Sequence, residues 1–102
     1  MNAKLATAIK EIEAFAAAEK SETAKLDALF AKSTSAYYAA ADPDATPEEK
    51  RTADEIERAI AAAVAHREEL QALKKAKNIE AARIARELGD NDLADLYEIS
   101  AI

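Results

Sequence analysis

Apolar residues recur every three or four positions along almost the whole chain, which is the spacing of one face of an α-helix. No stretch alternates apolar and polar residues in the way that a half-buried β-strand does. The pattern therefore predicts an all-α protein. The residues that carry it are Leu5, Ile9, Ile12, Phe15 and Ala16, then Leu26, Leu29, Phe30, Ser33 and Tyr37, and later Ile79, Ile84, Leu88, Leu93, Leu96 and Tyr97.

The clearest break in this pattern is the segment 42–49, Asp-Pro-Asp-Ala-Thr-Pro-Glu-Glu. Its two prolines end one helix, and Thr46 is suited to cap the next helix, with Pro47 at the first helical position. At a second break, Gly89 is suited to the left-handed conformation that closes a helix, and Asp90 or Asn91 starts a new helix. These two signals predict helix boundaries around the prolines and around the glycine.

Two weaker breaks lie at Lys20-Ser21 and Lys77-Asn78, where a capping residue is followed within two positions by glutamate. With these breaks the chain forms a single domain, 1–102, built as a compact antiparallel bundle of four to five helices. The alternative is that helical phase continues across Ser21 and Asn78, which gives two helices of about forty residues each. Such a hairpin would expose its apolar seam and demand a homodimer, whereas the compact bundle favours a monomer. The five helices of the favoured interpretation lie near 2–19, 22–41, 47–75, 78–88 and 91–101.

Composition makes the core thin and argues against several classes of function. Half of the residues are hydrophobic, but 28 of the 102 residues are alanine. The net charge is −6 and basic residues are interleaved with acids, which argues against nucleic-acid binding because that needs a concentrated basic face. Without cysteine there is no disulfide or thiolate metal site. The longest apolar run, 59–65, is too short to span a membrane and no signal-peptide pattern is present, so we expect a soluble cytoplasmic protein.

The single histidine, His66, is the strongest candidate for chemistry. Side chains on a helix lean toward its N-terminus, so the imidazole is expected to lie over the methyl groups of Ala59, Ala62 and Ala63, with space beside it. A titratable ring that can bind metal and that faces a gap predicts a ligand site. This expectation takes the inward row of helix 47–75 to be Ile56, Ala59, Ala63, His66, Leu70 and Leu73.

Haem is the most concrete ligand for such a site, with His66 as the axial ligand of the porphyrin iron and therefore as the metal ligand. Helical bundles build cofactor sites from inward-facing side chains, and small residues admit a planar ring. The second ring nitrogen of a ligating histidine needs an acceptor, for which Glu69, Glu22 and Thr23 are the candidates. The expected function is a binding module for a planar small molecule. Its cofactor-binding residues are expected to be His66, Ala59, Ala62, Ala63, Leu70 and Thr23.

Two other functions stay open. The first is a structural or protein-interaction protein without a small-molecule site, in which the alanines only allow helices to pack closely. The second is a catalyst that uses His66, the only catalytic candidate, as a general base. Enzymatic activity is otherwise expected only if a bound haem supports peroxidase-like or group-transfer chemistry. A single histidine excludes the zinc-protease motif, and a single glycine excludes phosphate-binding loops.

Tyr37 and Tyr38, preceded by Ser33-Thr34-Ser35, form the most unusual local composition. Tyr37 falls on the inward row and is expected to pack at the end of the bundle. In the alternative interpretation Tyr37 donates a hydrogen bond to a ligand and Tyr38 lies exposed at an interface. A catalytic pair of Ser33 with His66 is disfavoured, because in an antiparallel hairpin the two residues lie more than two turns apart.

The whole chain resembles computationally designed helical bundles in its minimal loops, its alanine-, glutamate- and lysine-rich helices, and caps such as Thr46-Pro47-Glu48-Glu49. Separately, the segment from Asn78-Ile79-Glu80-Ala81-Ala82 through Leu88-Gly89-Asp90 to Ala94 and Tyr97 resembles one tetratricopeptide-type repeat over about a fifth of the chain. No second copy is detectable, so this resemblance implies a helix-turn-helix at 78–97 and no binding groove.

Overall fold

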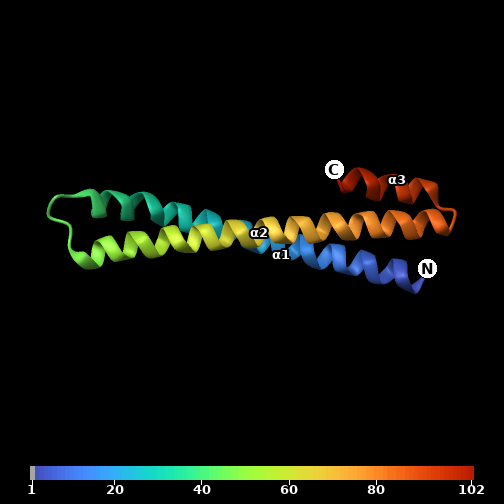
Figure 1. Ribbon diagram of the computed structural model, residues 1–102, viewed down its shortest axis with the longest axis horizontal. Coiled ribbons are helices and arrows are strands. Elements are labelled where there is room, and N and C mark those ends of the chain that lie inside the picture. Colours follow the sequence, from blue (N-terminus) through green and yellow to red (C-terminus); the bar gives the residue numbers. More distant parts are fainter. Residues whose placement is uncertain (1) are drawn as a thin grey trace. The chain divides into compact units, whose positions relative to one another are not determined.

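The computed structural model describes residues 2–102 and contains three α-helices. They are α1 (Ala3–Ala41), α2 (Pro47–Glu87) and α3 (Asn91–Ser100) (Figure 1). The described residues form no β-strand, so the predicted all-α class is confirmed. The predicted count of four to five helices is wrong.

The count differs because the helix runs without a break through Ser21 and through Asn78. Neither residue has a glycine or proline beside it that would stop propagation. The Asn78 side chain does not cap a new helix; its amide donates a hydrogen bond of 2.9 Å to the carbonyl of Lys74, one turn earlier in the same helix. The alternative of two long helices, 39 and 41 residues in the structure, is therefore the correct one.

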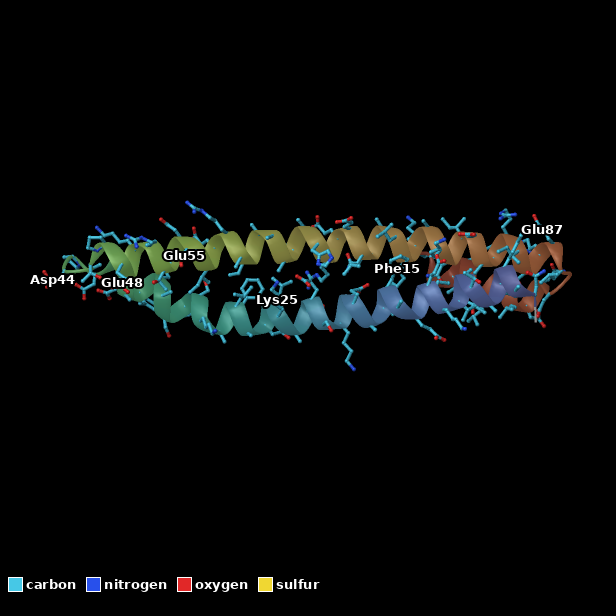
Figure 2. The ribbon with its side chains drawn as sticks, turned by 90° about the horizontal axis from the view of Figure 1, so that it is seen from below. Phe15, Lys25, Asp44, Glu48, Glu55 and Glu87 are labelled. Atoms are coloured by element: carbon cyan, nitrogen blue, oxygen red, sulfur yellow. The ribbon has the colours of Figure 1, made fainter. Side chains whose placement is uncertain are left out.

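The start of α2 follows the sequence signal at the loop 42–46. The Glu49 N–H donates to the Thr46 hydroxyl at 3.1 Å, and the Thr46 N–H donates to the Glu49 carboxylate at 3.0 Å, which together form a capping box. Figure 2 labels Asp44 in this loop and Glu48 in the first turn of α2. The predicted cap and the first helical position, Pro47, are confirmed.

The end of α2 is also as predicted. Gly89 has a φ of +79°, its N–H donates to the carbonyl of Arg86, and the N–H of Asp90 donates to the carbonyl of Ala85, which is the Schellman pattern. Asp90 then caps α3, because its carboxylate accepts from the N–H of Leu93 at 3.1 Å. Of the two starts left open, Asp90 is the capping residue; a turn and the short helix α3 follow α2 as predicted, although no helix begins at Asn78.

The chain divides into two units that are each described separately. Unit 1 contains the residues up to Glu19 and Glu68–Ile102, and unit 2 is Lys20–Arg67. Unit 1 thus holds the start of α1, the second part of α2 and all of α3, while unit 2 holds the rest of α1, the loop and the start of α2. Each unit is built from two or three helical segments, so neither is the four- to five-helix bundle that the sequence predicts.

The core of unit 1 joins all three of its helical segments. Its buried centre is Leu5 and Ala8 from α1 with Ala81 and Ile84 from α2, and Leu93 and Tyr97 of α3 pack against it. Helix α3 therefore covers the seam between the other two segments. Two ion pairs connect the same segments, Lys77 with Glu11 at 2.6 Å and Lys74 with Glu19 at 2.8 Å.

Unit 2 has only two helical segments and a much thinner core. Leu26 and Ala63 are the only buried residues that the structure describes in this unit. The larger side chains Leu29, Ile56, Ile60 and Val64 are partly buried. No third segment of the unit covers this pair, which leaves large apolar side chains at the surface.

Several residues expected on inward rows are exposed. In unit 1 these are Leu73, Ile79, Leu88 and Leu96, and in unit 2 they are Phe30 and Tyr37. With two or three helical segments to a unit, one face of each helix meets a neighbour and the other faces stay open to solvent. Among residues 2–102, no helix combines the length and the apolar character needed to cross a membrane.

Candidate functional site

His66 lies on α2 within unit 2, and 53% of its side chain is exposed. The expectation that the imidazole faces the interior is therefore wrong. The buried neighbour is Ala63, three residues earlier, whereas Ala62 and His66 share an exposed strip of the helix, four residues apart.

His66 is exposed because the buried row of α2 does not follow the inward row assumed from the sequence. The partly or fully buried row of α2 passes through Arg67, one residue after the histidine. A long arginine side chain can bury its aliphatic stem at an inward position of a helix. The hydrophobic pattern of the sequence does not mark such a position as inward, because the residue type is polar. The buried row of α2 is Ile56, Ile60, Ala63, Arg67, Leu70, Lys74, Lys77, Ala81 and Ile84.

The partner of His66 is Glu22 on α1. The Glu22 carboxylate lies 3.2 Å from His66 Nδ1 and is itself largely buried, with 12% of its side chain exposed. Lys25 contacts the same carboxylate at 3.8 Å from the adjacent turn of α1. Of the three acceptors left open by the sequence, Glu22 is the one the structure selects. A carboxylate at this position favours the ring proton on Nδ1 and leaves Nε2 as the nitrogen for a ligand.

The other residues predicted to line a cofactor site do not form one lining. Thr23 and Ala59 are partly buried, Ala62 is exposed and Ala63 is buried, all within unit 2. Leu70 is buried and belongs to unit 1. The alanine methyl groups thus point to different sides of α2, and the structure does not gather them into a slot beside the imidazole.

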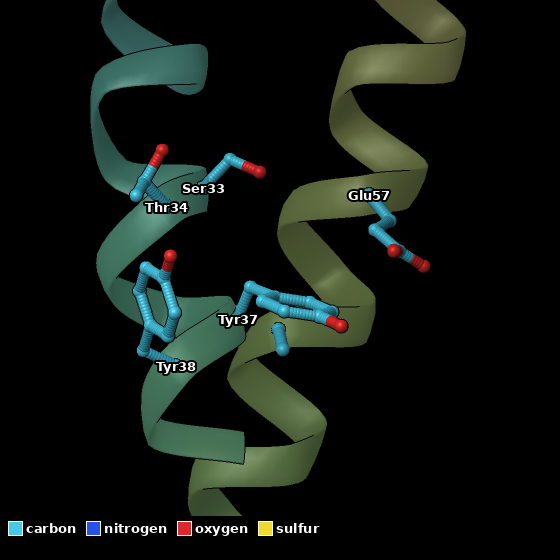
Figure 3. A pocket seen from close by; sticks show the side chains of 6 residues that line it. Ser33, Thr34, Tyr37, Tyr38 and Glu57 are labelled. Carbon is cyan, nitrogen blue, oxygen red and sulfur yellow. The ribbon is translucent and has the colours of Figure 1, made fainter. Parts of the chain in front are cut away.

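A hollow in unit 2 lies between α1 and α2, toward the loop that joins them. It is open to solvent and has a volume of about 320 Å³, at the lower end of the range of small-molecule sites. Tyr37 reaches from α1 toward α2, while Ser33, Thr34 and Tyr38 line the α1 wall and Glu57 comes from α2 (Figure 3). The residues around the hollow are Ser33, Thr34, Tyr37, Tyr38, Ala53 and Glu57.

The two tyrosine rings set the character of this hollow. Their centroids are 5.9 Å apart and their planes meet at 72°, an edge-to-face arrangement that aromatic pairs favour. Tyr37 and Tyr38 are 64% and 70% exposed, so most of both rings is accessible. The prediction that Tyr37 packs into the bundle is wrong. The structure exposes Tyr38, as the alternative interpretation expected.

The sequence signal for the hollow was present in Ser33-Thr34-Ser35 and the two tyrosines, but nothing in the sequence joined them to Glu57. Tyr37 follows Ser33 by four residues and Tyr38 follows Thr34 by four, which places each pair along one side of α1. Glu57 lies 19 or more residues further along the chain, and only the antiparallel pairing of α1 with α2 brings it opposite.

Residues 2–102 contain no group of three or more histidine, cysteine, aspartate or glutamate side chains that could hold a metal ion. His66 and Glu22 are an imidazole with an orienting carboxylate, which is part of what a general base needs. Ser33 and Tyr37 line the hollow and His66 does not, so the disfavoured pairing of Ser33 with His66 has no support. Comparisons with protein-family models, with curated proteins and with solved structures found no match to the chain.

Proposed function

We propose that this protein is a helical interaction module that self-associates, with two copies packing unit 2 against unit 2. The surface involved is the aromatic face, which we define as Phe30, Tyr37 and Tyr38. These three side chains are 52%, 64% and 70% exposed on a two-helix unit. That exposure is the observation that carries the proposal, because clustered apolar surface of this kind marks interaction sites.

The contrast between the two units supports a helical partner. In unit 1 the seam between α1 and α2 is covered by α3 through Leu93 and Tyr97. In unit 2 no third segment covers the corresponding side of the pair. Two copies of a two-helix unit form a four-helix bundle, which is a stable way to bury such faces. A two-fold pairing also lets the same surface serve both copies.

The available area is consistent with a small dimer interface. At roughly 200 Å² for each aromatic side chain, the exposed parts of the three supply about 370 Å² in each copy. Two copies supply more than half of the roughly 1,200 Å² at which specific interfaces begin, before any flanking residue is counted. The continuity of α1 and α2 is the condition under which the sequence itself predicts a homodimer.

Sedimentation velocity over a concentration series tests the proposal. The wild-type protein is expected to shift from monomer to dimer as its concentration rises through the micromolar range. The double variant Phe30→Glu/Tyr37→Glu should stay monomeric, because it places charge in the apolar interface. Lys32→Glu, at an exposed position on another side of α1, changes the net charge by the same amount; it is the matched control and should dimerise like the wild type. Circular dichroism checks that all three proteins keep their helices.

Two results would contradict self-association through this surface. One is a wild-type protein that remains monomeric at several hundred micromolar. The other is a double variant that dimerises as strongly as the wild type, which would place the interface elsewhere.

Haem binding at His66 is the second candidate, and one observation favours it. The Glu22 carboxylate beside Nδ1 orients the ring and leaves Nε2 directed to a ligand. A haem here would lie on the surface, because the alanines do not form a slot. Titration with hemin should give a red-shifted, sharpened Soret band that His66→Ala abolishes and Glu22→Gln weakens. The absorbance of free hemin in all three proteins would remove this candidate, and with it any haem-dependent peroxidase-like activity.

A further inference from the structure

We propose that the hollow beside the aromatic face binds an organic cation, an ammonium or guanidinium group. In the dimer, a lysine or arginine side chain of the second copy supplies this cation, and in that respect the inference rests on the proposed function. The hollow is the one lined by Ser33, Thr34, Tyr37, Tyr38, Ala53 and Glu57.

The first support is the aromatic geometry. With the planes of Tyr37 and Tyr38 at 72° and their centroids 5.9 Å apart, the rings present faces in two directions. The face of an aromatic ring carries negative charge from its quadrupole and attracts cations. Both rings remain mostly exposed, so a cation can approach a ring face without moving either side chain.

The second support is the charge around the hollow. Its lining contains one carboxylate, Glu57, and no lysine, arginine or histidine. No hydrogen bond or ion pair within residues 2–102 engages the Glu57 carboxylate, so its charge is available to a ligand. A chain with a net charge of −6 adds to the attraction for a cation and opposes an anion.

The third support is the polar groups on the α1 wall. The hydroxyls of Ser33 and Thr34 line the hollow, and within the described residues neither is engaged in a hydrogen bond. Each can accept a hydrogen bond from an N–H of an ammonium or guanidinium group. A volume of about 320 Å³ admits such a head group with part of its alkyl stem. Rings, carboxylate and hydroxyls together match a basic side chain better than an apolar one.

The chain offers a direct reporter for the test, because it has three tyrosines and no tryptophan. Two of the three tyrosines lie in the hollow. Dilute, monomeric protein is titrated with tetramethylammonium chloride, with sodium chloride at equal ionic strength as the reference. Tyrosine fluorescence and the aromatic NMR signals of Tyr37 and Tyr38 are followed. Saturable changes with tetramethylammonium alone are expected, while the signals of Tyr97 in unit 1 stay unchanged.

Two variants and a control assign the site. Tyr37→Leu removes a ring face and Glu57→Gln removes the charge. Each is expected to weaken tetramethylammonium binding about two- to five-fold, which is the contribution of a cation–aromatic contact at an exposed site. Glu55→Gln, at an exposed position on the same helix, changes the net charge equally and should bind like the wild type. In sedimentation, Glu57→Gln should raise the dimer dissociation constant by a similar factor and Glu55→Gln should not.

The outcomes separate this inference from the proposed function. If the dimer forms and Glu57→Gln behaves like Glu55→Gln in both measurements, the cation site is overturned and self-association stands. If no dimer forms but tetramethylammonium binds and the two variants weaken it, self-association is overturned and the cation site takes a free ligand. Identical responses to tetramethylammonium and sodium overturn the cation site whatever the oligomeric state.

Discussion

At the residue scale, polar side chains occupy positions of the buried seam that a sequence pattern assigns to apolar residues. Glu19 and Glu22 lie on the inward row of α1, and Arg67 and Lys74 lie on that of α2. Glu19, Glu22 and Lys74 bury their stems and bring their charges to partners, whereas the Nε of Arg67 is buried without a hydrogen-bond partner. The pairs Lys74–Glu19 and His66–Glu22 are the result. A histidine beside such a row looks inward in the sequence and lies outside in the structure.

Gly89 is the residue whose backbone most constrains what can replace it. Its φ of +79° suits glycine, and a Cβ built there would meet no atom within 4 Å. The cost of Gly89→Ala is therefore conformational only, and we expect a loss of about 1 kcal/mol in the free energy of unfolding, measured by urea denaturation. Gly89→Asn should lose less, because asparagine tolerates this region of φ. An alanine variant as stable as the wild type would contradict the left-handed cap.

At the element scale, helix ends could be predicted from the sequence and helix continuity could not. Thr46, Gly89 and Asp90 act through bonds to residues one turn away, so local spacing is enough to place them. At Ser21 and Asn78 the local pattern contains both a capping residue and an unbroken apolar spacing without glycine or proline, so it fits a break and a continuous helix equally. The all-α class and α3 could therefore be predicted from local spacing. The number of helices could not, because it depends on whether α1 and α2 continue through Ser21 and Asn78.

Arg86 of α2 bonds to two acidic residues of α3, and we expect these bonds to slow the local unfolding of α3. Its guanidinium donates to Asp95 at 2.9 Å and to Glu98 at 3.0 Å, and these hydrogen bonds, that to Glu98 first, raise the pKa of Arg86. Arg86→Met should speed amide hydrogen exchange in α3 at low salt and less so at 1 M salt. Arg83→Met removes a pair within α2 only, Arg83–Glu87, and should leave α3 exchange unchanged. Equal effects of the two variants would mean that packing alone holds α3.

The ion pairs of Lys77 should make the stability of the contact between α1 and α2 in unit 1 depend on pH. Hydrogen bonds to Glu11, first, and to Glu80 raise the pKa of Lys77 above its ordinary 10.5. A raised pKa in the folded state means that this stabilisation is fully present below pH 10.5 and is lost as the pH rises through the folded value. The difference in melting temperature between wild type and Lys77→Met should therefore shrink above pH 10.5. All other titrating groups are common to the two proteins. A difference in melting temperature that stays constant as the pH rises would therefore exclude a stabilising role for the charge of Lys77.

At the scale of the whole molecule, the candidate site could be predicted only in its parts. The tyrosines and hydroxyls of α1 follow one another in the sequence, but Glu57 joins them only through the pairing of two helices. His66 was expected to be a ligand because the assumed inward row of α2 passed through it, whereas the buried row passes through Arg67, the next residue. The small-molecule function, the single domain and the resemblance to designed proteins remain predictions, because the arrangement of the helices tests none of them.

The alanines buried in unit 1 set a limit on the size of side chain that this part of the molecule accepts. Ala81, Ala85 and Ala94 are 0% exposed and Ala82 is 3% exposed, so an added methyl group there has no solvent to move into. These four positions therefore admit little added volume, and a polar side chain there would also need a hydrogen-bond partner away from solvent. Any relative of this chain should keep residues no larger than serine at all four, even where every surface charge has been exchanged.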